Sequence, residues 1–227
     1  MDKINILTWN TSLYLEKTNE PISEKYSSFA NIVKKHLEKD NSIAFLQEIP
    51  YVSNETWQKH SLFNKLNSDF SNDKYDIEYN ITSKNQIMMT VAITRKGEMK
   101  RNNAMINDNR TISIEFNGLH FTGIHAKNGA DNKKYLNAID NNDADIILGD
   151  FNSGNYLESE NRDTFNQILK EYICICNMPT KITKTGRRTC IDHVFVREEM
   201  VTNCSNLIIH EEIKLSDHFP VTFEINK

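Results

Sequence analysis

The chain has 227 residues, of which 38% are hydrophobic and 26% are charged, and its formal net charge is −4. This composition is typical of globular proteins, the apolar runs are too short to cross a bilayer, and the acidic charge argues against coating DNA by charge alone. We therefore expect one domain over residues 1–227. The acidic charge does not exclude an enzyme that binds phosphate through a metal ion. Because residues 1–5 form no apolar leader, we also expect a cytoplasmic protein, and we expect a monomer.

The N-terminal part of the chain predicts a β-α-β unit. Residues 4–9 are an apolar run typical of a strand, which ends at Asn10, and residues 23–39 carry apolar side chains at helical spacing. A second strand at 42–46 ends just before Glu48. Two strands joined through a helix run parallel, so Asn10 and Glu48 should lie at the same carboxyl edge of a sheet, where such sheets bind ligands.

The middle of the chain predicts helices and strands in mixed order. The expected elements are a helix at 54–70, strands at 87–94, 111–116 and 119–124, and a helix at 131–141. The first of these helices would turn Trp57 inward, and the alternating residues of 111–116 predict a half-exposed strand. Asn117 and Gly118 predict a hairpin turn into the following strand, which ends at His125.

The last third of the chain contains the most informative strand end. The expected elements are strands at 146–148, 173–176, 190–196, 206–210 and 221–225, and a helix at 159–172. Gly149 stops the strand at 146–148, and Asp150 and Asn152 follow at once. A carboxylate and a carboxamide where a buried strand surfaces indicate a need for oxygen ligands and hydrogen bonds.

A basic segment at 179–188 is expected to be a loop. Its cationic residues are Lys181, Lys184, Arg187 and Arg188. Such a loop is either an ordinary solvated segment or a surface that follows a phosphate backbone. We place Arg187 and Arg188 with the residues expected to bind substrate.

Polar residues interrupt or end several strands, and together they predict one site. Glu48, Asp150 and Asp217 offer the carboxylate oxygens that Mg²⁺ prefers. His125 and His218 suit proton transfer near neutral pH. Taken singly, these residues also fit strand-end caps, satisfied buried histidines or an ordinary turn. Their joint occurrence favours a metal-dependent phosphoester site.

Three further residues complete the chemistry of this predicted site. Asp192 lies inside an apolar strand, where a buried charge needs a partner, and such a carboxylate can hold an imidazole in its working tautomer. Asn10 and Asn152 can orient phosphate oxygens without adding charge.

Five segments in chain order resemble the motifs of the endonuclease/exonuclease/phosphatase superfamily. They are ILTWN at 6–10, LQE at 46–48, GDFN at 149–152, IDHVF at 191–195 and SDHFPV at 216–221. This superfamily includes deoxyribonuclease I, the exonuclease III-type AP endonucleases, the neutral sphingomyelinases and the inositol polyphosphate 5-phosphatases. The resemblance implies an α/β fold, a four-layer α/β/β/α sandwich of two mixed β-sheets flanked by helices. It also implies a Mg²⁺ cofactor, with Mn²⁺ as the alternative ion.

The resemblance also implies roles for the residues that bind metal and phosphate. Glu48 matches the metal ligand, and Asn10 matches the residue that supports metal and phosphate. Asp217 matches a further carboxylate of the metal site. Asp150 and Asn152 match the pair that positions the phosphate and the attacking water.

The remaining matched residues would move protons or bind substrate. His218 resembles the general base or transition-state stabiliser, oriented by Asp192. His125 resembles the histidine that protonates the leaving oxygen in deoxyribonuclease-like members. Arg110 fits a recurrent arginine of the superfamily, and we place it with the substrate-binding residues.

The chain departs from the superfamily pattern at three points. His193 stands where an aromatic residue is commoner. The acidic partner expected for His125 is not evident, and Glu78 is one guess. The tyrosine typical of AP endonucleases is missing because His125 occupies that strand end, which argues against repair of AP sites.

We therefore predict a Mg²⁺-dependent phosphoesterase in which water attacks phosphorus in line. The leading substrate class is nucleic acid, cleaved by a nuclease-type phosphodiesterase. The alternatives are a phosphomonoesterase or lipid phosphodiesterase, resembling the inositol phosphatases or the sphingomyelinases, and a binding protein with an inactive site.

Overall fold

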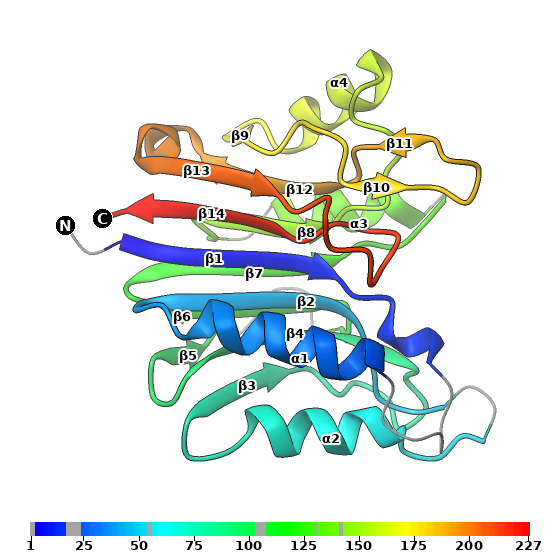
Figure 1. Ribbon diagram of the computed structural model, residues 1–227. Helices are drawn as coiled ribbons and strands as arrows, with labels where there is room; N and C mark the ends of the chain where they lie inside the picture. The colour runs from blue at the N-terminus through cyan, green and yellow to red at the C-terminus, as the bar shows by residue number, and fades with distance from the viewer. Residues whose placement is uncertain (1–2, 17–23, 54–55, 103–107, 130, 141–142) are drawn as a thin grey trace.

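Figure 1 shows the computed structural model of the chain, which describes residues 3–16, 24–53, 56–102, 108–129, 131–140 and 143–227. The predicted β-α-β unit is present: β1 (Lys3–Asn10) and β2 (Ser42–Pro50) pair in parallel, and α1 (Glu24–Leu37) connects them. Side chains of a strand alternate between its two faces, so Trp9 packs toward α1 while Ile6 faces the opposite side.

The other strands complete two sheets of six strands each. The first sheet adds β3 (Tyr75–Tyr79), β4 (Met88–Arg95), β13 (Cys204–Ile209) and β14 (Val221–Asn226). The second contains β5 (Met99–Arg101), β6 (Thr111–Phe116), β7 (Leu119–His125), β8 (Ile146–Asp150), β9 (Tyr172–Cys174) and β12 (Asp192–Arg197). Their orders are β13-β14-β1-β2-β4-β3 and β5-β6-β7-β8-β12-β9. Each sheet is mixed, with one parallel pair, β1–β2 or β7–β8, near its centre.

Helices cover the outer faces of both sheets. The remaining elements are α2 (Ser61–Phe70), α3 (Asp131–Asp140), α4 (Ser159–Ile168), η1 (Leu13–Leu15), η2 (Glu198–Asn203), β10 (Lys181–Ile182) and β11 (Arg188–Thr189). The aromatic and aliphatic side chains of α1 and α2 pack on the first sheet, and those of α3 and α4 on the second. Phe45 and Phe121 meet between the sheets, with ring centroids 5.8 Å apart. The predicted four-layer α/β/β/α sandwich is therefore confirmed.

The predicted hairpin is present, but the exposure of its first strand was wrong. β6 and β7 are joined by Asn117 and Gly118, whose φ angles of 51° and 69° are both positive, as a two-residue turn of this kind requires. β6 is buried on both faces rather than half exposed. Its polar face is also buried: Ser113 hydrogen-bonds the hydroxyl of Thr122 on β7 at 2.9 Å, and Thr111 hydrogen-bonds the hydroxyl of Tyr135 on α3.

Two helix predictions were too long. The helix expected at 54–70 begins only at Ser61, because His60 caps α2 by accepting a hydrogen bond from the backbone N–H of Leu62 (3.2 Å). Trp57 therefore lies outside the helix and is 61% exposed instead of buried, while residues 54–55 fall outside the described ranges. The helix expected at 159–172 ends at Ile168, and Tyr172 begins β9.

The strand content of the chain was underestimated. β3 and β5 were not predicted, since both are short, partly exposed and rich in polar residues. The basic segment at 179–188 is not a loop but a small hairpin, β10–β11, in which Lys181 pairs with Thr189. Among the described residues, no helix is long and apolar enough to span a membrane.

Candidate active site

The carboxyl ends of the parallel strands bring the predicted residues together at one edge of the sandwich. In the second sheet, His125 of β7 and Asp192 of β12 both lie opposite Asp150 of β8. Asn10 at the end of β1 reaches across from the first sheet and donates its amide Nδ2 to Asp150 Oδ2 at 2.8 Å. Asp150 is therefore the residue at which both sheets meet.

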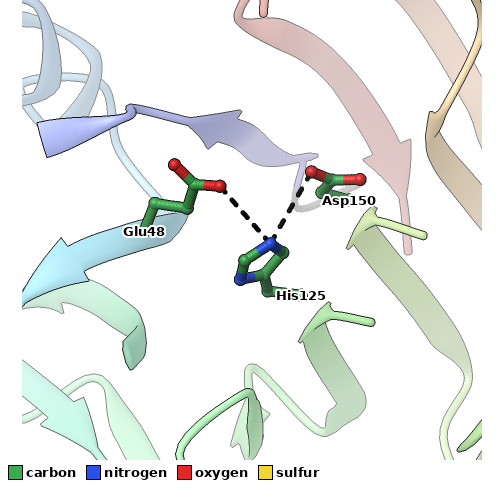
Figure 2. Close-up of side chains that lie close together, drawn as sticks. All are labelled: Glu48, His125 and Asp150. Carbon is green, nitrogen blue, oxygen red and sulfur yellow. Dashed lines mark ion pairs between the residues drawn. The ribbon is translucent and has the colours of Figure 1, made fainter. Parts of the chain in front are cut away.

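Glu48 reaches this edge because β2 contains a bulge. The pairing of β2 with β4 shifts register between Leu46 and Ile49, and Glu48 has a φ of 57°. A positive φ costs free energy for a residue with a Cβ, and such strain persists where the surrounding structure enforces it, often at functional sites. The bulge places Glu48 Oε1 3.5 Å from His125 Nε2, as Figure 2 shows.

Asp150 is held rigidly and is almost completely buried. Its Oδ1 accepts the backbone N–H of Asn152 at 2.9 Å, and its Oδ2 lies 3.9 Å from Nε2 of His125. Gly149 precedes it with a φ of 132°, and a Cβ there would clash with the carbonyl oxygen of Ile124. Only glycine fits this close approach of β7 and β8.

Asn152 also depends on an unusual backbone conformation. Its φ is 47°, a region that Asn tolerates better than most residues, and its Nδ2 donates to the carbonyl of Ala126 at 3.1 Å. The side chain is therefore tied to the segment after β7, beside Asp150.

Asp192 and His218 form a buried hydrogen-bonded pair. Nδ1 of His218 lies 2.9 Å from both carboxylate oxygens of Asp192, and Thr180 Oγ1 donates to Asp192 Oδ2 at 2.7 Å. Nε2 of His218 lies 3.8 Å from Asp150 Oδ2. Burial alone would lower the pKa of His218, but the two aspartates outweigh it and raise the pKa to about 9. The two carboxylates therefore favour the protonated, cationic form of this imidazole.

His125 has the opposite electrostatic setting. Arg110 Nη1 lies 3.2 Å from His125 Nδ1. Burial, followed by the positive charge of Arg110, lowers the pKa of His125 to about 3. A guanidinium can only donate hydrogen bonds, so Nδ1 accepts and the ring proton is on Nε2, which faces Glu48 and Asp150.

The donor set fits a hard divalent cation. Ligand atoms of Glu48, His125 and Asp150 lie within 4.8 Å of one another. Burial raises the pKa of Glu48 and of Asp150, and the repulsion between neighbouring carboxylates adds to this for Asp150, so the folded site favours an added positive charge. Because Nε2 of His125 carries a proton, Glu48 and Asp150 are the members of this group that can supply oxygen ligands, the type that Mg²⁺ prefers. Each carboxylate oxygen of Asp150 accepts one hydrogen bond and keeps a further lone pair for a metal ion.

Asp217 lies apart from this carboxylate pair. Its Oδ2 is 3.1 Å from Lys181 Nζ, and its Oδ1 accepts a hydrogen bond from Ser12 Oγ at 3.2 Å. Within the described parts of the chain, it joins neither group of residues spaced to hold a metal. Lys181 was missed as a site residue, although it belongs to the basic segment noted in the sequence, because its approach to Asp217 depends on the β10–β11 hairpin.

The two arginines expected to bind substrate are engaged elsewhere. Arg187 pairs with Glu158, with Nη2 and Oε1 2.5 Å apart, and Arg188 pairs with Glu211. Both are exposed. Glu78, one guess for the acidic partner of His125, instead lies 3.7 Å from Arg101. The acidic neighbours of His125 are Glu48 and Asp150.

Comparison with solved structures gives the fold. Humanized D. rerio TDP2 matches with a TM-score of 0.69 at 14% identity, covering 99% of both chains. The 3′-5′ exonuclease NExo from Neisseria meningitidis matches with a TM-score of 0.67 at 17% identity, covering 99% of this chain and 100% of that one. A further NExo structure, described as a 3′ phosphatase, is bound to a product DNA hairpin.

A third neighbour carries the superfamily name itself. It is an endonuclease/exonuclease/phosphatase family protein from Leptotrichia buccalis, with a TM-score of 0.66 at 18% identity over 99% of this chain and 100% of that one. No protein-family model matches the sequence, and no curated protein matches it. The chain has the deoxyribonuclease I-like fold of the endonuclease/exonuclease/phosphatase superfamily, as the five sequence motifs predict.

Proposed function

We propose that this chain is a Mg²⁺-dependent phosphoesterase of one domain, and most specifically a nuclease-type phosphodiesterase that hydrolyses nucleic acid by in-line attack of water. The observation that carries the proposal is the convergence of Glu48 and Asp150 beside the Asp192–His218 pair, at the edge where both sheets meet. Acid–base and metal-binding groups in this arrangement suit transfer of a phosphoryl centre to water.

The metal would be held by Glu48 and Asp150, and when bound it supplies positive charge that stabilises the pentavalent transition state. Mn²⁺ is the alternative ion. Asn10 fixes the carboxylate of Asp150 through its amide, and Asn152 lies beside it, tied to Ala126. These contacts hold the carboxylate in one orientation, so little reorganisation is needed when substrate binds.

The two histidines have different roles in this proposal. His218 is cationic and oriented by Asp192, so it stabilises negative charge developing on the phosphate oxygens. His125 is neutral and presents its Nε2–H toward the same space. It therefore acts as a hydrogen-bond donor to a substrate oxygen. The proton of the attacking water passes to the carboxylate of Asp150, whose pKa is raised by burial, and the leaving oxygen takes its proton from solvent.

A phosphomonoesterase is the second candidate, and one observation favours it. Arg187 and Arg188, the cations expected to follow a nucleic-acid backbone, are paired with Glu158 and Glu211. A long backbone contact would have to break these pairs, whereas a terminal phosphate needs only the buried residues of the site.

The test is a parallel assay on plasmid DNA, end-labelled single-stranded DNA, RNA and a small phosphomonoester, each with Mg²⁺ or EDTA. Asp150→Ala and His218→Ala should lose at least a hundredfold in rate. Asp163→Asn and His120→Ala, which lie outside the site, should keep the wild-type rate.

Cleavage of the polymers supports the nuclease proposal, and release of phosphate from the monoester alone supports the second candidate. Full activity in EDTA, or in Asp150→Ala, would reject both. A folded protein that binds Mg²⁺ but leaves every substrate intact would point to a lipid substrate or to a binding function.

A further inference from the structure

The β10–β11 hairpin is attached by its backbone to the segment that carries Asp217 and His218. The N–H of Ile182 donates to the carbonyl of Asp217 at 2.9 Å, and the N–H of Phe219 donates to the carbonyl of Thr180 at 2.7 Å. These two bonds form an isolated antiparallel bridge between Lys181 and His218. The hairpin therefore fixes Lys181 directly beside the site.

The side chain of Lys181 lies within the electrostatic field of the site. Its Nζ is 3.1 Å from Asp217 Oδ2, and its side chain is only 24% exposed. Burial opposes its charge, but the attraction of Asp217, Asp150 and Asp192 outweighs this and raises its pKa. Lys181 therefore remains an ammonium ion while it is half buried.

Both oxygens of Asp217 already have partners in this arrangement. Oδ2 contacts Lys181, and Oδ1 accepts the hydrogen bond from Ser12. A divalent ion bound at Asp217 would have to displace the ammonium group or lie beside it, and two like charges at such a distance repel strongly in a partly buried site. The ammonium group of Lys181 therefore disfavours a second divalent ion at Asp217 through its charge.

We infer that the ammonium group of Lys181 is the second cation of this site: it neutralises Asp217 in place of a metal ion and binds a non-bridging oxygen of the substrate phosphate. The site then takes a single divalent ion, held by Glu48 and Asp150. A lysine suits this role because its ammonium is a compact point charge with three donors, a common ligand of phosphate. The inference rests on the proposed phosphoesterase function.

The first test counts metal ions rather than activity. Titration of the metal-free protein with Mn²⁺, followed by calorimetry and electron paramagnetic resonance, should give one ion per chain. Glu48→Gln should lose this ion, whereas Asp217→Asn should keep its affinity within about threefold, because Asp217 is not a ligand.

The outcomes of this titration separate the two proposals. Two ions per wild-type chain, or loss of the ion in Asp217→Asn, overturns the role of Lys181 and leaves the phosphoesterase proposal intact. A wild-type chain that binds no Mn²⁺ refutes the metal-dependent function itself, and the inference with it.

The second test measures binding of inorganic phosphate to the Mn²⁺-loaded protein. Lys181→Met should weaken phosphate binding about tenfold, the effect of removing one charge-assisted hydrogen bond, and Lys181→Arg should restore most of it. Lys184→Met is the matched control, since Lys184 belongs to the same hairpin but is exposed. Its phosphate affinity should equal that of the wild type.

Circular dichroism and a melting curve establish that each variant is folded. An unchanged phosphate affinity in a folded Lys181→Met protein, or an equal loss in Lys184→Met, overturns the inference.

Discussion

Nη1 of Arg110 lies 3.2 Å from Nδ1 of His125, whereas the other ring nitrogen, Nε2, faces Glu48 and Asp150. The resemblance to deoxyribonuclease-like proteins implies that His125 protonates the leaving oxygen. A neighbouring guanidinium instead favours a neutral imidazole whose Nε2–H is fixed in place. Arg110 thus favours a role for His125 as a hydrogen-bond donor rather than as a general acid.

This relationship predicts how His125 tolerates substitution. His125→Gln keeps an N–H donor and should retain activity within about tenfold, whereas loss of a general acid costs about 10²–10⁴-fold. His125→Leu, which removes the donor, is the matched variant and should be the weaker enzyme. Rates measured under substrate saturation decide the matter: equal, large losses in both variants would restore the general-acid role.

Metal binding should stabilise the protein measurably. Because Glu48 and Asp150 have pKa values raised by burial, a divalent ion relieves unfavourable charge in the folded state only. At a hundredfold excess of Mg²⁺ over its dissociation constant, the gain should be about 2.7 kcal/mol. Thermal melts with and without Mg²⁺ measure it, and Glu48→Gln should abolish most of the shift. A rise of the same size in that variant would mean that Mg²⁺ binds elsewhere.

The strained backbone of Glu48 predicts an order of stability among its variants. Glycine tolerates a φ of 57° and alanine does not, so Glu48→Gly should be more stable than Glu48→Ala by about 1 kcal/mol. Both variants should be inactive, because both lack the carboxylate. Urea unfolding of the metal-free proteins measures the difference. An alanine variant as stable as the glycine variant would show that the bulge relaxes once the carboxylate is gone.

His193 predicts a pH dependence of stability. It is fully buried among Phe151, Phe165 and Phe195, and its Nε2 has no hydrogen-bond partner among the described residues. Burial lowers the pKa of His193 to about 4 in the folded protein, whereas the ordinary pKa near 6.5 applies to the unfolded chain. Below pH 6.5 the unfolded chain therefore binds a proton at this histidine more readily than the folded protein does. Stability from this group is therefore present above about pH 6.5 and is lost as the pH falls toward 4.

Replacement of His193 by phenylalanine should remove this loss. Between pH 7 and pH 5, the difference in unfolding free energy between His193→Phe and wild type should shift by about 2 kcal/mol in favour of the variant, since one pKa unit corresponds to about 1.4 kcal/mol. Urea unfolding at both pH values measures the gain. His36, whose pKa burial also lowers to about 4, stays in the variant and leaves part of the acid sensitivity. A wild-type chain and variant with parallel pH profiles would contradict the prediction.

Much of the fold and of the site was predictable because the informative signals are local. An apolar run that ends in Asp150 and Asn152 indicates both a buried strand and a polar strand end. The parallel pairing of β1 and β2 follows from the helix between them. Predictions of this kind need only the order of residues along one segment.

The features that escaped prediction depend on contacts between distant segments or on backbone detail. Lys181 and Asp217 are 36 residues apart and meet only through the β10–β11 hairpin. The bulge at Glu48 has no signature in the sequence around it, since glutamate is not a residue that favours positive φ. Strand β5 is short and polar and becomes a strand only because β6 offers it a free edge.

The antiparallel pairing of β14 with β1 joins the two ends of the described chain, and it fixes when the site can assemble. The indole of Trp9 donates to the carbonyl of His218, across 209 positions of sequence, at 3.2 Å. Contacts of such long range form late, because the entropy of closing a long loop opposes them. During synthesis on the ribosome, the hydrogen bond between Asp192 and His218 would therefore form only after β14 has paired with β1. A partly synthesised chain would lack this pair.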